Sequence, residues 1–155
     1  PEKVLSGSLY NMFEEMAEAF DLGKIDLATY SPLTLAYIGD CVYELIIRTR
    51  LVYAGNAPVD KLNRKASNLA KAGTQSAMIE ALIPELTDEE TAAYKRGRNA
   101  HSYTRAKNAT AGDYRRATGF EALIGYLYLD KRFERIMELV KKGFEAVECN
   151  DSERK

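Results

Sequence analysis

Residues 31–55 read SPLTLAYIGDCVYELIIRTRLVYAG, and this stretch decides the fold. Ser31 followed by Pro32 is typical of a helix N-cap with proline at the first helical position, and Gly55 is a suitable C-cap. Between them, apolar residues recur at spacings of three and four, which is the period of a helix rather than of a strand. The stretch therefore predicts one long, mostly apolar helix over residues 33–54.

The rest of the chain repeats the helical period, and no segment alternates cleanly with period two. The sequence therefore predicts an all-α fold. Thr87 and Glu90 have the spacing of a capping box, which marks a helix start. Residues 97–112 lack apolar periodicity and predict a long loop, a feature that in compact domains is usually functional or disordered. The remaining helices are expected at 9–20, 59–72, 74–82, 87–95, 113–130 and 131–147.

The chain has 155 residues, 46% of them hydrophobic and 29% charged, which fits one globular domain. We divide it into an N-terminal amphipathic helix and linker (1–30), a main helical domain (31–148) and a polar tail (149–155). No apolar run approaches the roughly 20 residues that span a bilayer, and residues 1–30 contain no basic segment followed by an apolar stretch, so we expect a protein that is not exported. Two cysteines and one histidine make neither a disulfide framework nor a standard zinc site, so we expect a cytoplasmic protein.

The formal net charge of −1 conceals a segregation of charge along the chain. Residues 1–45 carry two Lys and eight Asp or Glu, whereas residues 46–116 carry thirteen Lys or Arg and seven Asp or Glu. A single basic run is usually a solvated face, but two basic regions suit a polyphosphate backbone. The candidate contacts to such a partner are Lys61, Arg64, Lys65, Arg96, Arg98, Asn99, Arg105 and Lys107.

Two carboxylates, Asp40 and Glu121, stand inside the two most apolar helices. A buried charge without a partner is costly, so each acid needs a cation, a network of donors or a metal. If the helices cross where Gly39 and Gly125 permit close approach, both acids converge, and Glu44 lies one turn beyond Asp40 as a candidate third ligand. Mg²⁺ or Mn²⁺ prefers such oxygen ligands. The alternative, which the spacing leaves open, is that each acid is a structural residue paired with Arg.

Three further residues near these features have simpler interpretations. His101, in the basic loop, is not expected to act as a catalytic base and is a candidate contact to phosphate. Cys41 is expected to be a small buried hydrophobic residue, because no histidine neighbours it in sequence. Tyr37 is a candidate for lining the site that contains Asp40.

The stretches LAYIGD at 35–40 and FEALIGYLYL at 120–129 resemble the catalytic domain of the ribonuclease III family. The chain is most similar to the smaller Mini-ribonuclease III branch, which lacks an appended double-stranded-RNA-binding domain. The stretches KRGRNA at 95–100 and AGTQSA at 72–77 also resemble that branch. The resemblance covers about residues 31–145.

This resemblance implies a mostly helical homodimer with a valley for double-stranded RNA. Asp40 and Glu121 match the family's metal-linked catalytic carboxylates, which bind Mg²⁺, with Mn²⁺ as a substitute, to activate water for attack on a phosphodiester. The branch trims the precursor of the large-subunit (23S) ribosomal RNA, and assistance by a ribosomal protein is left open. Without an appended binding domain, the catalytic domain and its basic residues are expected to supply the affinity for RNA.

Two positions depart from the wider family. Ala36 stands where the signature has a glutamate four residues before the aspartate, and Thr118 stands where it has an aspartate three residues before the second glutamate. Mini-ribonuclease III has the same reduced set. The leading hypothesis is a metal-dependent, double-strand-specific endoribonuclease. The alternative is a catalytically silent RNA-binding or ribosome-associated scaffold with the same fold; the clustered basic residues disfavour a dimerisation module without RNA.

Overall fold

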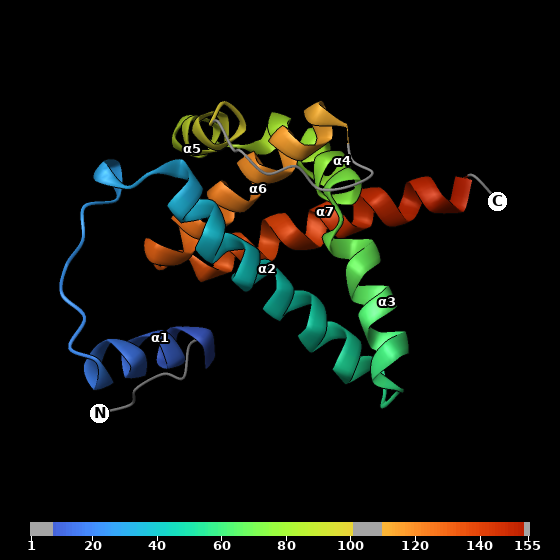
Figure 1. Ribbon diagram of the computed structural model, residues 1–155, viewed down its shortest axis with the longest axis horizontal. Coiled ribbons are helices and arrows are strands. Elements are labelled where there is room, and N and C mark those ends of the chain that lie inside the picture. Colours follow the sequence, from blue (N-terminus) through green and yellow to red (C-terminus); the bar gives the residue numbers. More distant parts are fainter. Residues whose placement is uncertain (1–7, 101–109, 154–155) are drawn as a thin grey trace.

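The computed structural model describes residues 8–100 and 110–153, and in these ranges every regular element is helical (Figure 1). The predicted all-α fold is confirmed. No helix in the described ranges is long and apolar enough to cross a membrane. The α-helices are α1 (Ser8–Ala19), α2 (Pro32–Ala54), α3 (Val59–Ala70), α4 (Ala72–Leu82), α5 (Asp88–Arg98), α6 (Ala111–Leu129) and α7 (Phe133–Glu153), with short 3₁₀ helices η1 (Leu27–Thr29) and η2 (Ile83–Glu85).

The predicted helices are all present, and the largest differences are that α5 ends three residues and α7 six residues beyond the predicted ends. Helix α6 begins two residues before the predicted start, because the Thr110 side chain caps it by accepting a hydrogen bond from the backbone nitrogen of Asp113 at 3.0 Å. The predicted end of the last helix at 147 is wrong, because α7 continues to Glu153 through the exposed residues 149–153 of the tail. The predicted loop at 97–112 is shorter at both ends, and its residues 101–109 lie outside the described residues.

The expected caps are confirmed. The Ser31 hydroxyl accepts a hydrogen bond from the backbone nitrogen of Leu33 at 3.2 Å, with Pro32 in the first turn of α2. Gly55 ends the helix with φ of 150°, a backbone conformation that residues with side chains rarely adopt. At the start of α5, Thr87 and Glu90 form both hydrogen bonds of the capping box.

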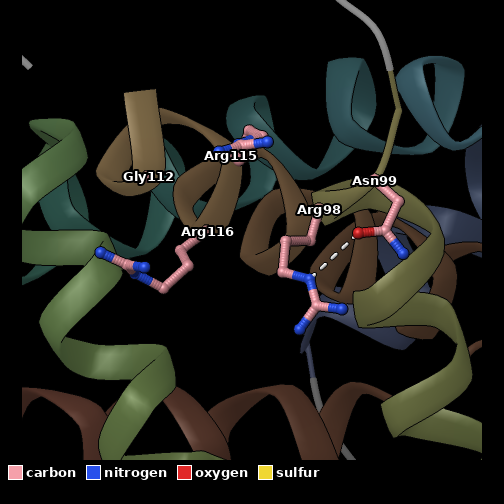
Figure 2. Close-up of a pocket in the computed structure, with 5 residues that line it drawn as sticks. All are labelled: Arg98, Asn99, Gly112, Arg115 and Arg116. Atoms are coloured by element: carbon pink, nitrogen blue, oxygen red, sulfur yellow. Dashed lines mark hydrogen bonds between the residues drawn. The ribbon is translucent and has the colours of Figure 1, made fainter. Parts of the chain in front are cut away.

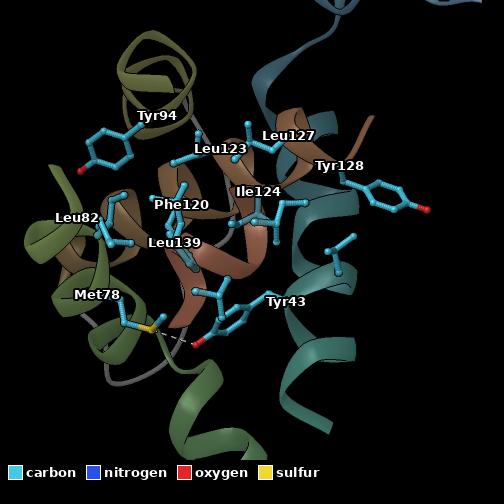
Figure 3. Close-up of a cluster of buried hydrophobic side chains, with 14 of the residues drawn as sticks. Tyr43, Met78, Leu82, Tyr94, Phe120, Leu123, Ile124, Leu127, Tyr128 and Leu139 are labelled. Carbon is cyan, nitrogen blue, oxygen red and sulfur yellow. Dashed lines mark hydrogen bonds between the residues drawn. The ribbon is translucent and has the colours of Figure 1, made fainter. Parts of the chain in front are cut away.

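Helix α6 is the centre of the fold, and it packs against α2, α4, α5 and α7. Figure 3 shows the buried cluster around it, with Phe120 and Leu123 of α6 beside side chains from the surrounding helices. The ring of Tyr43 meets that of Phe120 edge-on, with centroids 5.4 Å apart. Burial of these large apolar side chains supplies the main driving force for the fold.

The closest helix packing is the crossing of α2 and α6. A methyl group built on Gly39 would overlap the carbonyl oxygen of Glu121 and lie 2.7 Å from the backbone nitrogen of Gly125. A methyl group built on Gly125 would in turn overlap the carbonyl oxygen of Leu35. The two backbones therefore touch at a point where only glycine fits on either helix.

A buried ion pair joins α5 to α7. The Glu90 carboxylate is fully buried, and its two oxygens accept hydrogen bonds from Nε and a terminal nitrogen of Arg135, each at 2.8 Å. These hydrogen bonds hold the pKa of Glu90 below its ordinary value. Such a pair is costly to break, because removing one partner leaves the other charge buried.

Helix α1 is attached to the corner where α6 meets α7 (Figure 1). The ring of Phe13 lies 5.3 Å from that of Tyr128 and 5.9 Å from that of Phe133. The Glu14 carboxylate accepts a hydrogen bond from Lys131 Nζ at 2.8 Å. The predicted N-terminal amphipathic helix therefore packs through its apolar face at this corner.

Gly39→Ala is expected to lower the free energy of unfolding by about 1–3 kcal/mol, because the added methyl group must push α2 away from α6. Gly73→Ala is the matched control, because Gly73 lies in α4 with no atom within 4 Å of an added methyl group. This control is expected to raise stability by about 0.5–1 kcal/mol through helix propensity. Urea unfolding measures the free energy of unfolding of both variants. A Gly39→Ala protein as stable as the parent would contradict the close crossing of α2 and α6.

Candidate active site

The crossing of α2 and α6 brings the two predicted carboxylates together. Asp40 directly follows Gly39 on α2, and the Gly39 backbone packs against the backbone carbonyl of Glu121 on α6. The sequence prediction that glycines would let these helices approach and that both acids would converge is therefore confirmed. Neither carboxylate forms a salt bridge in the part of the chain that the structure describes. Within residues 8–100 and 110–153, the alternative of structural acids paired with Arg is therefore not found.

The two acids differ in their environment. Glu121 is half-buried, and burial, followed by the negative charge of Asp40, raises the pKa of Glu121 to about 8. Asp40 remains accessible to solvent. Partial burial of its carboxyl group, followed by the negative charge of Glu44, raises the pKa of Asp40 above its ordinary value. Both shifts mean that the site disfavours two negative charges and would favour them if a cation were bound.

Glu44 lies one turn beyond Asp40 but has another partner. Its carboxylate accepts a hydrogen bond from Arg48 Nε at 3.1 Å. Its charge still acts on both acids, because it helps to raise the pKa of Asp40 and of Glu121. In residues 8–100 and 110–153, no three His, Cys, Asp or Glu side chains are arranged to hold a metal ion. The acids that could hold a metal ion here are therefore the pair of Asp40 and Glu121, with Glu44 one turn away.

This pair fits a hard divalent cation that keeps most of its water. Mg²⁺ is usually held by one or two carboxylates with waters completing its coordination, so a third protein ligand is not required. All donors at the site are oxygens, and a buried amide oxygen of Gln75 next to Glu121 has no hydrogen-bond partner in the described residues. A hydrated cation would neutralise the two carboxylates and provide donors for such an acceptor.

Ala36 and Thr118, the two positions that depart from the wider family, add no charge to the site. Ala36 is buried and packs with Leu35 and Ala122. The hydroxyl of Thr118 donates a hydrogen bond to the backbone oxygen of Tyr114 at 3.0 Å, within its own helix. Both positions therefore serve helix packing or the helix backbone rather than carrying an extra carboxylate.

Sequence reasoning missed the role of Gln75. This side chain enters from the first turn of α4, is fully buried and contacts the carboxyl group of Glu121, where it opposes the rise in pKa. The stretch containing Gln75 was noted only for its resemblance to the family. A polar residue among the apolar positions of a short helix is the signal that could have identified it.

The structure corrects the expectation that Cys41 is buried, and it shows where Tyr37 lies on α2. Cys41 is exposed rather than buried, because it lies on the outer face of α2 while the neighbouring Val42 and Tyr43 face the core. Tyr37, one turn before Cys41, is 81% exposed. With Leu33, Leu45 and Val52, these two residues form an exposed apolar face, which we call the α2 stripe.

The predicted basic residues divide into separate groups. Lys61, Arg64 and Lys65 are exposed on α3, as the amphipathic pattern predicted. On α5, Arg96 donates a hydrogen bond to the backbone oxygen of Tyr30 at 3.0 Å, whereas Arg98 lies over the ring of Tyr94. The structure therefore gives these two neighbouring arginines different surroundings. Arg105, Lys107 and His101 lie outside the described residues.

Arg98 and Asn99 line a pocket of about 260 Å³ together with residues of α6 that the sequence analysis had not selected (Figure 2). Arg98 Nε donates to the side-chain oxygen of Asn99 at 3.2 Å. Across the pocket, Arg116 is directed toward α4, where its Nε donates to the Ser76 hydroxyl at 2.7 Å. The complete lining is Arg98, Asn99, Gly112, Arg115 and Arg116, which we call the arginine pocket.

The arginine pocket carries more positive than negative charge. Arg116 pairs with Asp113 at 3.0 Å and with Glu80 at 3.2 Å, so its charge is largely compensated. No salt bridge involves Arg98 or Arg115 in the described part of the chain, and Arg115 is exposed. Arginine presents several donors in a fixed geometry that suits phosphate, so the pocket is equipped to bind an anion of that kind.

An all-helical domain with a carboxylate pair at its central crossing and arginines nearby has the chemistry of a phosphodiester-cleaving enzyme. Comparison with known proteins agrees, because a family model described as the ribonuclease III domain matches residues 33–132. The chain belongs to the ribonuclease III family and is therefore an endoribonuclease by family, a hydrolase of RNA phosphodiester bonds.

Relatives place it more narrowly, in the Mini-ribonuclease 3 branch. Mini-ribonuclease 3 of Clostridium tetani is 48% identical over 134 residues, covering 84% of this chain and 89% of its own. Mini-ribonuclease 3 of Brevibacillus brevis is 45% identical over 118 residues, covering 76% and 88%. A crystal structure of a Fusobacterium nucleatum protein is 32% identical with a TM-score of 0.71, covering 76% of this chain and 96% of that one.

Proposed function

We propose that this protein is a Mg²⁺-dependent endoribonuclease that cleaves double-stranded RNA and matures the precursor of 23S ribosomal RNA. The observation that carries the catalytic part is the convergence of Asp40 and Glu121 at a glycine-permitted helix crossing, with no salt bridge to either acid in the described residues. The family membership and the basic surfaces support RNA as the substrate. The 23S precursor is the substrate that the family resemblance implies.

Asp40 and Glu121 would hold the cation, and Glu44 is a candidate third ligand through its position one turn beyond Asp40. Mg²⁺, with Mn²⁺ as a substitute, supplies a Lewis acid that activates water and stabilises charge on the phosphoryl oxygens. The chain itself fixes the two carboxylates on rigid helices that cannot move apart without losing the packing between α2 and α6. The half-buried position of Glu121 limits the access of solvent to that side of the site.

Double-stranded RNA is recognised mainly by its shape, its phosphates and its 2′-hydroxyl groups. The arginine pocket suits a backbone phosphate, and the exposed cations Lys61, Arg64 and Lys65 on α3 offer further contacts. Arg96, Arg105 and Lys107 remain candidate contacts from the sequence. These groups position the duplex and carry no base-specific information. A ribosomal protein that presents the RNA and a cytoplasmic location also remain predictions.

Asp40→Asn is expected to reduce cleavage of labelled double-stranded RNA by more than about 100-fold, because it removes a negative charge from the cation site without changing its shape. Binding of the duplex is expected to persist. The assay compares Mg²⁺, Mn²⁺ and EDTA, with Asp151→Asn, at an exposed position on α7, as the control. Metal-dependent cleavage that disappears only in Asp40→Asn supports the enzyme; duplex binding by the parent protein without cleavage in either metal would favour the RNA-binding scaffold.

Combining Arg98→Ala with Arg115→Ala is expected to raise the Kd for double-stranded RNA by about tenfold and to reduce its salt dependence, because two phosphate contacts are lost. The rate at saturating RNA should change less. The control, Lys24→Ala with Lys141→Ala, removes the same charge from exposed positions outside the pocket. Filter binding across a salt series measures the Kd and its salt dependence for each double variant. Equal Kd values for the two double variants would mean that the arginine pocket does not touch RNA.

We further propose that the protein is a homodimer and that the α2 stripe contributes to its interface. Val52 is 60% exposed and Leu45 is 45% exposed on the same helix that carries Asp40, so pairing there would bury apolar surface beside the carboxylate site. Sedimentation equilibrium at micromolar concentration is expected to give a dimer for the parent protein and for Met137→Glu on α7. Leu45→Glu is expected to be monomeric. A parent protein that sediments as a monomer would contradict the proposal.

A further inference from the structure

Gln75 is a buried polar side chain next to the carboxylate site. Its residue is fully buried at the start of α4, and its Nε2 donates a hydrogen bond to the backbone oxygen of Ala70, at the end of α3, at 3.1 Å. Its Oε1 is buried and has no hydrogen-bond partner in the described residues. A buried carbonyl without a donor is costly, so this half of the amide needs an explanation.

Capping of the C-terminal end of α3 explains the position of the Gln75 Nε2 group but not that of Oε1. The last backbone oxygens of α3 are satisfied by three separate side chains, since Thr74 donates to Asn68 at 2.7 Å, Tyr43 donates to Leu69 at 2.7 Å and Gln75 donates to Ala70. A helix end needs such donors. However, this function uses Nε2 alone and gives no reason for a buried Oε1.

The surroundings of Gln75 supply a second function. The amide contacts the carboxyl group of Glu121, across the packed interface of α4 and α6. Groups that contact a metal-binding carboxylate commonly fix its orientation, and their loss weakens metal binding. In addition, the water shell of a cation held at this carboxylate would offer donors to an acceptor such as Oε1.

We propose that Gln75 is a positioning residue, which fixes the Glu121 carboxylate for a divalent cation and offers its Oε1 to the water around that cation. The inference rests on the proposed metal-dependent function and deepens it. It also connects α3, through Ala70, with the cation site, because one amide contacts both. Gln75 itself does not need to touch the RNA.

The test is the Mn²⁺ affinity of Gln75→Met, measured by electron paramagnetic resonance without RNA. Methionine keeps the length of the side chain and lacks the amide, so the Kd for Mn²⁺ is expected to rise about tenfold or more. The Mg²⁺ concentration for half-maximal cleavage should rise in parallel, with a smaller effect on the rate at saturating Mg²⁺. Gln75→Asn keeps an amide but withdraws it from Glu121, and is expected to change both values in the same direction.

Tyr43→Phe is the matched control, because it removes the neighbouring hydrogen bond to the end of α3 and leaves the Gln75 amide in place. It is expected to lower the melting temperature while its Kd for Mn²⁺ stays within about twofold of the parent value. Folded Gln75 variants that bind Mn²⁺ as tightly as the parent would overturn the proposal, even if their melting temperature falls. A parent protein that binds no Mn²⁺ would instead overturn the metal-dependent function, and this inference with it.

Discussion

The contact between the backbones of α2 and α6 is the constraint on which the rest of the structure depends. Gly39 and Gly125 each lie against the backbone of the other helix, so neither helix can carry a side chain at the crossing. This contact fixes α2 on the central helix of the core, and it places Asp40 and Glu121 at the same point without any loop between them. Rigid helices hold a site more accurately than loops do, so the same packing serves both stability and the geometry of the site.

The position of the carboxylates imposes a cost that no salt bridge in the described residues offsets. A crossing between two apolar helices is an unfavourable place for negative charge, and the raised pKa values of Asp40 and Glu121 express this. Elsewhere in the protein a buried acid is compensated, since Glu90 receives two hydrogen bonds from Arg135 and its pKa is lowered. The contrast between a compensated and an uncompensated acid separates a structural pair from a candidate active site.

Much of the fold was predictable from local patterns, because helix periods and caps depend on neighbouring residues. Ser31, Thr87 and Gly55 ended or began helices as expected, and the glycine spacing predicted the convergence of the two acids. Features that depend on which faces meet in three dimensions were not predictable. Cys41 lies on an outward face of an apolar helix, and the partner of Glu90 lies 45 residues along the chain. Helix α7 also continues through the exposed residues 149–153, where no apolar period marks a helix.

The first turn of α4 connects the carboxylates with the arginine pocket. Gln75 contacts Glu121, and the next residue, Ser76, accepts a hydrogen bond from Arg116. Arg116 and Glu121 also lie five residues apart on α6, which is about 7.5 Å along the helix axis. The arginine pocket and the carboxylates are therefore held at a fixed separation by two packed helices. An anion bound in the pocket would therefore have its distance from the carboxylates set by the packing of α4 against α6, and this is the condition for aligning a phosphodiester with the two acids.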